Sequence, residues 1–259
     1  MILGHELFGT GDDGVIVMHD FYGCRDTWSF ARNFFDTRSF TWAFTEVRGY
    51  GDSRHMAGEY TPVEAAADIM ALADNLGWER FHVIGHSMSG MLAQRVVLDG
   101  GDRVKSAILN TPVAASGLSF SPEGFSIIEG SIASNELLGQ AFDALTGERL
   151  CPEWREFKIR QTRSTRLVAA QQGYLKNLTE QGFLDEIRGN PTPMLVIIGE
   201  YDMEPFTEQT ARNTFTQWYP NAEVAVCGNA GHYPQQEAPV YVATLINNFL
   251  ARQTTGVPV

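Results

Sequence analysis

A serine at position 87 lies in a setting that favours nucleophilic catalysis. The residues before it, from Phe81 to Ile84, form an apolar run typical of a buried strand, and the residues after it have an apolar face at helical spacing. Gly85 and Ser89 are small enough for the sharp strand-to-helix turn that exposes a nucleophile. A plain strand-to-helix turn is the alternative, and it would leave the serine without a chemical role.

An aspartate and a histidine later in the chain could complete this chemistry. Asp202 follows the apolar run from Met194 to Ile198, at the carboxyl end of a predicted strand, where a carboxylate can orient a histidine. Glu200 and Glu204 are weaker candidates for the same role. His232 lies on a loop between the last predicted strand and the last predicted helix. Taken alone, each could belong to an ordinary surface loop, but together with the serine they predict a triad for acyl transfer.

The elements that must position these residues alternate between apolar strands and amphipathic helices, which predicts an α/β fold with a mostly parallel sheet. The predicted strands are Val15 to Met18, Thr41 to Val47, Phe81 to Ile84, Ala107 to Leu109, Met194 to Ile198 and Glu223 to Val226. Between Thr111 and Pro191 only helical patterns occur. We therefore expect a core of residues 1–113 and 189–259 with a helical cap, or lid, of residues 114–188.

A glycine-rich segment near the N-terminus, Gly9-Thr-Gly-Asp-Asp-Gly14, matches the GxGxxG pattern. A dinucleotide site needs a helix after those glycines, whereas a predicted strand follows here. The segment is therefore interpreted as a hairpin turn that leads into that strand.

The chemical motifs resemble those of the α/β-hydrolase family, in particular its esterases, lactonases and cofactor-free haloperoxidases. The serine, aspartate and histidine occur in the chain order of that family. The similar segments are the elbow Gly85-His-Ser-Met88, the acid loop Gly199-Glu-Tyr-Asp202, the histidine loop Ala230-Gly-His232 and the turn Arg48-Gly-Tyr-Gly-Asp-Ser53. The resemblance implies a mostly parallel central sheet with helices on both faces, an inserted helical cap over the pocket, and no cofactor.

The segment after the first predicted strand resembles the oxyanion turn of the family. Carried over, the backbone N–H groups of Phe21 and Met88 would form the oxyanion hole. Asp20 stands where the family usually has glycine, and we expect its carboxylate to point away from the hole and cap the turn. Four aromatic residues adjoin the site loops and are expected to line an apolar substrate pocket: Tyr22, Trp28, Phe206 and Tyr233.

The resemblance implies ester hydrolysis, with Ser87 as nucleophile, His232 as general base and Asp202 orienting the imidazole. A lactonase, which cleaves a cyclic ester in the same site, is the first alternative. Carbon–carbon bond hydrolases and hydroxynitrile lyases also resemble the family, whereas haloalkane dehalogenases and epoxide hydrolases place an aspartate at the nucleophile position. A small-molecule receptor built on the same fold is an alternative from another class.

The composition of the chain limits the kinds of partner that we expect it to bind. Lys and Arg total 19 and Asp and Glu total 31, a formal net charge of −12 that disfavours nucleic acid and anionic membranes. No segment approaches the ~20 apolar residues of a membrane helix, and the N-terminus lacks a signal-peptide pattern. Three scattered cysteines and six scattered histidines predict neither a disulfide framework nor a metal site. We expect a cytoplasmic monomer or homodimer that acts on a neutral or cationic small-molecule ester or lactone.

Overall fold

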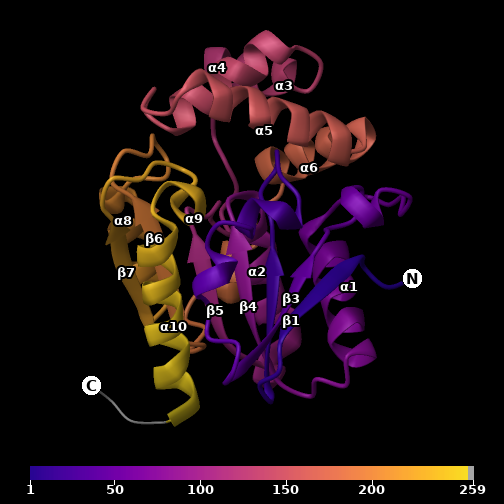
Figure 1. Cartoon of the computed structure of the whole chain (residues 1–259), viewed down its shortest axis with the longest axis vertical. Helices are drawn as coiled ribbons and strands as arrows, with labels where there is room; N and C mark the ends of the chain where they lie inside the picture. Colours follow the sequence, from indigo (N-terminus) through magenta and orange to yellow (C-terminus); the bar gives the residue numbers. More distant parts are fainter. Residues whose placement is uncertain (256–259) are drawn as a thin grey trace.

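Seven strands of the described residues form one sheet, in which the first strand runs antiparallel to its neighbour and the other six run parallel to one another (Figure 1). The computed structural model describes residues 1–255 of the chain. The strands are β1 (His5–Gly9), β2 (Asp13–Met18), β3 (Phe40–Thr45), β4 (Phe81–His86), β5 (Val104–Asn110), β6 (Met194–Gly199) and β7 (Ala222–Cys227). Their order in the sheet is β1-β3-β2-β4-β5-β6-β7. The predicted α/β fold is confirmed, and each predicted strand is present with bounds that differ by a few residues.

The edge strand β1 corrects the interpretation of the glycine-rich segment. Gly9 to Gly14 does not form a hairpin turn, because β1 pairs antiparallel with β3 and not with β2. The chain instead crosses the end of β3, where the Thr10 N–H donates to the carbonyl oxygen of Thr37 (2.9 Å). Burial is the physical reason: the apolar strand β2 needs a neighbour on each side, whereas the half-buried β1 suits the edge of the sheet.

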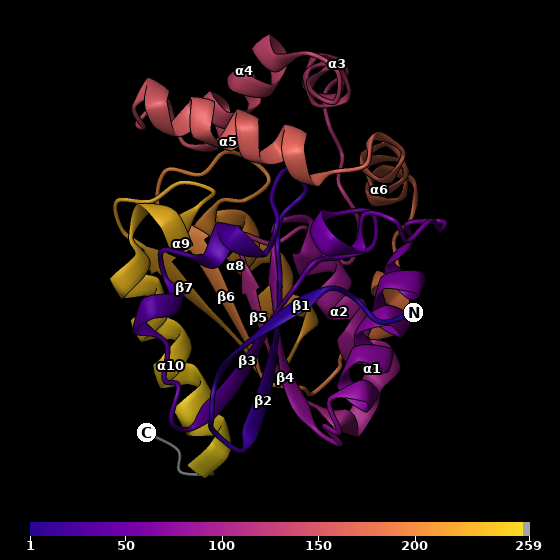
Figure 2. The same ribbon diagram turned by 45° about the vertical axis from the view of Figure 1, so that its right-hand side comes forward.

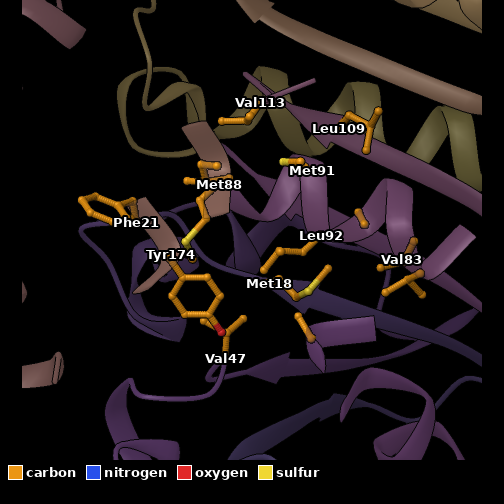
Figure 3. Close-up of a cluster of buried hydrophobic side chains, with 14 of the residues drawn as sticks. Met18, Phe21, Val47, Val83, Met88, Met91, Leu92, Leu109, Val113 and Tyr174 are labelled. Carbon is orange, nitrogen blue, oxygen red and sulfur yellow. The ribbon is translucent and has the colours of Figure 1, made fainter. Parts of the chain in front are cut away.

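Helices cover both faces of the sheet. One face is covered by α1 (Pro62–Asn75), α2 (Met88–Gly100) and α8 (Glu208–Trp218), and the other by the 3-10 helices η1 (Arg25–Trp28) and η2 (Arg32–Phe34) and by α10 (Pro239–Thr255). Alternate residues of a strand face opposite sides. In β2, Ile16 and Met18 therefore pack toward α1 and α2, whereas Val15 and Val17 pack toward α10. Figure 3 shows part of the apolar cluster between the sheet and the helices α1 and α2, in which Met18 lies among side chains of α2 such as Leu92.

The segment between β5 and β6, residues 114–188, forms a layer of helices above the carboxyl ends of the strands (Figures 1 and 2). We call this segment the insertion. It contains α3 (Pro122–Ser131), α4 (Asn135–Leu145), α5 (Pro152–Thr165), α6 (Val168–Glu180) and the short α7 (Leu184–Ile187), and it adds no strand to the sheet. The Leu167 N–H joins it to the core by donating to the carbonyl oxygen of Gly49 (2.8 Å). Neither these helices nor any other among residues 1–255 is long and apolar enough to cross a membrane.

Candidate active site

Ser87 occupies a tight turn between β4 and α2. Its φ of 55° lies in the left-handed region, which strains a residue other than glycine by about 1–3 kcal/mol. The surrounding backbone holds the turn from both sides. The Ser87 N–H donates to Asn110 O (2.9 Å), and its carbonyl oxygen accepts from the N–H groups of Gly90 (2.8 Å) and Val113 (2.9 Å). These bonds place the serine side chain at the carboxyl end of β4, as a nucleophile elbow requires.

Two small residues allow the elbow to be this tight. A Cβ on Gly85 would overlap the carbonyl oxygen of Ser89, so position 85 accepts only glycine. Ser89 itself is fully buried, and its Oγ–H donates to the carbonyl oxygen of His19 (2.5 Å). The hydroxyl group therefore ties the start of α2 to the turn that follows β2.

The side chains of Ser87, His232 and Asp202 form a continuous hydrogen-bonded relay. The Ser87 Oγ–H donates to Nε2 of His232 (2.8 Å), and the His232 Nδ1–H donates to Oδ2 of Asp202 (2.7 Å). The other carboxylate oxygen, Oδ1, accepts from the N–H of Met203 (2.8 Å). Ser87 is 7% exposed, Asp202 8% and His232 2%, so the relay is largely shielded from water. The structure brings together the three residues that the sequence placed far apart.

The electrostatics of Asp202 suit the role of orienting a histidine. Burial raises the pKa of its carboxyl group, and the charge and hydrogen bond of His232 and the N–H of Met203 oppose that shift. A carboxylate that accepts from Nδ1–H holds His232 in one tautomer, which leaves Nε2 free to take the proton of Ser87.

Glu200 and Glu204, the alternative candidates for the acid, form hydrogen bonds with groups other than His232. Oε2 of Glu200 accepts from the N–H of Asn229 (2.9 Å). Glu204 accepts from the hydroxyl groups of Thr207 and Thr210 (2.8 Å each). The geometry therefore favours the aspartate over both of them as the partner of the imidazole.

His86 holds the backbone of His232, and the sequence analysis did not identify it. The His86 Nε2–H donates to the carbonyl oxygen of His232 (2.7 Å), which also accepts from the Oγ–H of Thr111 (3.0 Å). The amide of Gln235 donates to Nδ1 of His86 (3.0 Å), and burial lowers the pKa of His86, a shift that the nearby Asp20 opposes. Its position next to the serine in the elbow motif is the signal that could have revealed it.

The turn after β2 lies at the same end of the sheet as the elbow. The carbonyl oxygen of Asp20 accepts from Nδ1–H of His19 (2.8 Å) and from the N–H of Gly23 (3.2 Å). Because the C=O and N–H of a trans peptide point in opposite directions, these bonds turn the Phe21 N–H away from both donors. Neither the Phe21 N–H nor the Met88 N–H donates to a group among residues 1–255. Both N–H groups are therefore available to an oxyanion.

The carboxylate of Asp20 caps its own turn, and the expectation from the sequence is confirmed. Oδ2 accepts from the N–H of Tyr22 (3.2 Å) and the phenol of Tyr233 (3.0 Å), and Oδ1 accepts from the Oγ–H of Thr27 (3.2 Å). Asp20 is 1% exposed and does not line the cavity described next. Its charge therefore lies behind the turn and not beside a developing oxyanion.

An apolar cavity lies between the insertion and the core, directly over the relay. The empty space at this site measures about 830 Å³, a volume that includes space open to solvent. Ser87, Met88 and His232 form part of its floor, and Figure 3 shows Phe21 and Met88 in the same cluster of apolar side chains. The insertion contributes further apolar lining, such as Ile128 and Leu175.

Tyr22, Phe206 and Tyr233 line this cavity, whereas Trp28 does not. The fully buried Trp28 packs in the cluster that α10 covers, and its Nε1–H donates to the carbonyl oxygen of Met18 (3.2 Å). Proximity to a site loop in the sequence suggested Trp28, but η1 turns this side chain toward the opposite face of the sheet. The prediction that Trp28 lines the pocket is therefore wrong.

Glu46 is a buried acid below the turn after β2. Burial raises the pKa of Glu46 to about 7, although the N–H and the charge of Arg25 oppose that shift. Nε2 of His19 lies 3.5 Å away but carries no balancing charge, because burial lowers the pKa of His19 to about 4. Between pH about 4.5 and 7 the folded protein holds a proton that the unfolded chain has lost. Stability therefore falls as pH rises through this window.

Replacing Glu46 with glutamine should remove this dependence of stability on pH. At pH about 8, Glu46→Gln is expected to raise the free energy of unfolding by up to about 3 kcal/mol, a gain that fades toward pH about 5. Urea unfolding across this range measures it. Glu6→Gln is the control with the opposite sign, because the hydrogen bond from Arg32 lowers the pKa of Glu6. A gain from Glu46→Gln that does not change with pH would contradict the prediction.

A second serine, histidine and aspartate meet at the amino ends of the strands. Oγ of Ser106 lies 2.7 Å from Nδ1 of His82, and Nε2 of His82 lies 3.5 Å from Oδ2 of Asp13. Asp13 also pairs with Lys105. Ser106 and His82 are fully buried and do not line the cavity, so the group links β2, β4 and β5 and does not meet a substrate. Among residues 1–255, no three His, Cys, Asp or Glu side chains are grouped to hold a metal ion.

Comparison with known proteins places these features in context. A sequence model described as "Alpha/beta hydrolase family" matches residues 15–245. The 2-hydroxymuconate semialdehyde hydrolase of Pseudomonas putida is 26% identical over 217 residues, which cover 80% of this chain and 75% of that protein. An uncharacterized carboxylesterase of Bacillus subtilis (strain 168) is 27% identical over 199 residues, 75% of this chain and 64% of that protein. A bromoperoxidase from Bacillus anthracis superposes with a TM-score of 0.85 at 16% identity, covering 95% and 94% of the two chains.

Proposed function

Because the chain belongs to the alpha/beta hydrolase family, we propose that it is a serine hydrolase that cleaves carboxylic esters. The relay of Ser87, His232 and Asp202 carries the proposal, with an Oγ···Nε2 distance of 2.8 Å and an Nδ1···Oδ2 distance of 2.7 Å. The cavity over this relay offers an acyl or alcohol group a place to bind. The similarity to a carboxylesterase supports the same activity.

The first half of the proposed reaction forms an acyl-enzyme. Oγ of Ser87 attacks the ester carbonyl carbon while Nε2 of His232 takes the hydroxyl proton. The carbonyl electrons move onto oxygen, and the N–H groups of Phe21 and Met88 stabilise the resulting oxyanion, each donor contributing about 2.7–4 kcal/mol. When the tetrahedral intermediate collapses, the C–O bond to the alcohol breaks and His232 returns its proton to the leaving oxygen. Asp202 stabilises the imidazolium throughout.

The second half releases the acid. Nε2 of His232 takes a proton from water as the water oxygen attacks the acyl carbon, which forms a second tetrahedral oxyanion in the same hole. The bond to Oγ of Ser87 then breaks, and His232 returns the proton to the serine. One ester and one water thus give one acid and one alcohol, and the enzyme is regenerated.

The lining of the cavity favours a neutral, apolar acyl group. Among the described residues that line it there is no Lys or Arg, and its acid, Glu204, is engaged by two threonine hydroxyl groups. A substrate carboxylate would enter this site without a cationic partner, which is costly in an apolar setting. This disfavours a carboxylate-bearing substrate such as that named for the Pseudomonas putida relative. We assign residues 114–188 as the cap of the pocket and residues 1–113 and 189–255 as the hydrolase core; the last four residues of the predicted core, 256–259, lie outside the described residues.

A panel of p-nitrophenyl esters tests the proposal. We expect kcat/KM to rise with acyl length until the cavity is filled. The monoester of adipic acid is the matched control for the hexanoate, since it has the same chain length with a terminal carboxylate, and its kcat/KM should be lower by about 10-fold or more. Equal rates for the two would contradict the assignment of the substrate class, and the absence of turnover on every ester would contradict the proposed function.

A lactone requires the same bond changes as a linear ester, so the same panel should include ε-caprolactone beside ethyl hexanoate. The ratio of their kcat/KM values decides between an esterase and a lactonase. Saturable binding of an apolar ester without repeated turnover would instead indicate a receptor. The cytoplasmic location and the state as a monomer or homodimer remain predictions from the sequence.

A further inference from the structure

Two side chains of the insertion donate hydrogen bonds to the turn that carries the Phe21 N–H. The Oγ–H of Thr162, in α5, donates to the carbonyl oxygen of Tyr22 (2.6 Å). The side-chain amide of Gln171, in α6, donates to the carbonyl oxygen of Phe21 (3.1 Å). Thr162 and Gln171 are fully buried. In Figures 1 and 2 the loop after β2 rises to the underside of these two helices.

A buried lysine of the insertion faces the same turn. Lys158 in α5 is fully buried, and its Nζ lies 4.6 Å from the centre of the Tyr233 ring and donates to Gln161 Oε1 (2.8 Å). The Tyr233 hydroxyl donates in turn to Oδ2 of Asp20 (3.0 Å). Burial alone would raise the pKa of Asp20, but the charge of Lys158 and the proximity of His86 hold it well below its usual range. Burial lowers the pKa of Lys158, and the charge of Asp20 opposes that shift, so the lysine and the carboxylate influence each other across Tyr233, which both of them contact.

The two hydrogen bonds from the insertion act on the two peptide groups that follow Phe21, next to the peptide group that carries the Phe21 N–H. The core holds Asp20 O through His19 and Gly23, and it holds Phe21 O through the Tyr50 hydroxyl (2.8 Å). The insertion adds Gln171 to Phe21 O and holds the following carbonyl group as well. An oxyanion donor is effective only when its N–H is held at hydrogen-bond distance from the position of the developing charge. Contacts that fix these peptide planes therefore affect the transition state more than the ground state.

We propose that Thr162, Gln171 and Lys158 are positioning residues for the oxyanion hole, so that the insertion takes part in the chemistry besides covering the pocket. The inference rests on the proposed function, because the hole has a role only if Ser87 forms a tetrahedral intermediate. These residues act through the turn and do not line the cavity.

The chain offers a matched pair of variants to test this. Gln171 and Asn177 both lie in α6 and both donate from a side-chain amide to core carbonyl groups, but Asn177 binds those of Glu59 (2.9 Å) and Tyr60 (3.1 Å), away from the turn. Gln171→Met is expected to lower kcat by about 10- to 100-fold with KM changed less than about threefold. Asn177→Leu should change kcat by less than about threefold.

Thr162 has a similar pair. Thr179, in α6, donates to Leu175 O (3.0 Å) within its own helix, whereas the single O–H of Thr162 lies between Lys158 O (2.8 Å) and Tyr22 O of the turn (2.6 Å), the nearer of the two. Thr162→Val should therefore lower kcat as Gln171→Met does, and Thr179→Val should not. Thr162→Ser keeps the hydroxyl group and should restore kcat to within about threefold of the wild-type value.

A transition-state analogue separates positioning from general destabilisation. A trifluoromethyl ketone that matches the best acyl chain adds to Ser87 and forms an oxyanion, whereas the corresponding methyl ketone serves as a ground-state isostere. Thr162→Val and Gln171→Met should raise the inhibition constant of the trifluoromethyl ketone by the factor by which they lower kcat/KM. They should leave the inhibition constant of the methyl ketone unchanged.

The charge balance has its own test. Lys158→Met is expected to lower kcat by about 10-fold in the wild-type background, where it removes a buried positive charge that contacts the same Tyr233 side chain as the Asp20 carboxylate. In the Asp20→Asn background the same change should cost less than about threefold, because no charge is left to balance.

The outcomes distinguish this inference from the proposed function. If the wild-type protein hydrolyses esters through Ser87 but Thr162→Val and Gln171→Met keep kcat and analogue affinity within about threefold, the positioning roles are overturned and the function stands. If the wild-type protein neither turns over an ester or lactone nor reacts with a fluorophosphonate at Ser87, the positioning roles and the proposed function are both overturned. Should one variant fail to fold, the other decides, since each is expected to show the loss by itself.

Discussion

Replacing Ser87 with alanine is expected to lower kcat for ester hydrolysis by about 10⁵- to 10⁶-fold, because the nucleophile and the covalent intermediate are lost together. The fold should persist, since the strained turn is held by backbone bonds to Asn110, Gly90 and Val113 that do not involve the hydroxyl group. Steady-state kinetics on the best p-nitrophenyl ester measure the loss, and the melting temperature reports the fold. Labelling with a fluorophosphonate, followed by mass spectrometry, should modify the wild-type peptide that contains Ser87 and not the variant.

Ser106 provides the control for this experiment. Ser106 is a buried serine that is hydrogen-bonded to His82, and His82 lies next to Asp13. These are the same residue types as in the candidate site, but they do not line the cavity. Ser106→Ala should keep kcat within about threefold of the wild-type value. If Ser87→Ala retained full activity, or if Ser106→Ala lost it, the assignment of the nucleophile would be wrong.

Replacing Asp202 with asparagine is expected to lower kcat by about 10⁴-fold. A neutral amide can donate to Nδ1 of His232 and so favour the tautomer that presents N–H to Ser87, which prevents proton removal. It also withdraws the negative charge that stabilises the imidazolium. The N–H of Met203 can still donate to the remaining side-chain oxygen, so the loop geometry should be preserved. Kinetics on the same ester measure the effect.

Glu200 is the matched control for Asp202. It lies two positions earlier on the same loop, but its carboxylate accepts from the N–H of Asn229 and is turned away from the imidazole. Glu200→Gln should therefore change kcat by less than about threefold. A large loss in Glu200→Gln together with near-normal activity in Asp202→Asn would show that the acid of the triad had been assigned to the wrong residue.

The elements that could be predicted from the sequence are those whose signals are local. Buried parallel strands are near-continuous apolar runs, and the elbow at Ser87 needs small residues at fixed offsets, so both can be recognised from a few consecutive residues. β1 was missed because an edge strand is half-buried and lacks such a run. For the same reason its pairing with β3, which lies between β1 and β2, was mistaken for a hairpin.

Side-chain direction was harder to predict than element position. Trp28 and Tyr22 both follow β2 closely, yet Tyr22 lines the cavity and Trp28 packs toward α10. The difference is decided by which layer of helices each side chain meets after folding, and no local pattern encodes it. Asp20 could be placed correctly because a short carboxylate readily caps its own turn, which is again a local interaction.

The sequence by itself determined the α/β fold, the elbow with its serine, and the order of Ser87, Asp202 and His232, because each rests on neighbouring residues and on chain order. Only the tertiary structure decided which acid meets the imidazole, that His86 binds the backbone of His232, and that Thr162 and Gln171 donate to carbonyl groups in the turn after β2. The last two lie 140 and 150 residues from the carbonyl groups they bind. Contacts at such separations exist only once the insertion has packed on the core, since hydrogen bonds depend on positions in space and not on spacing along the chain.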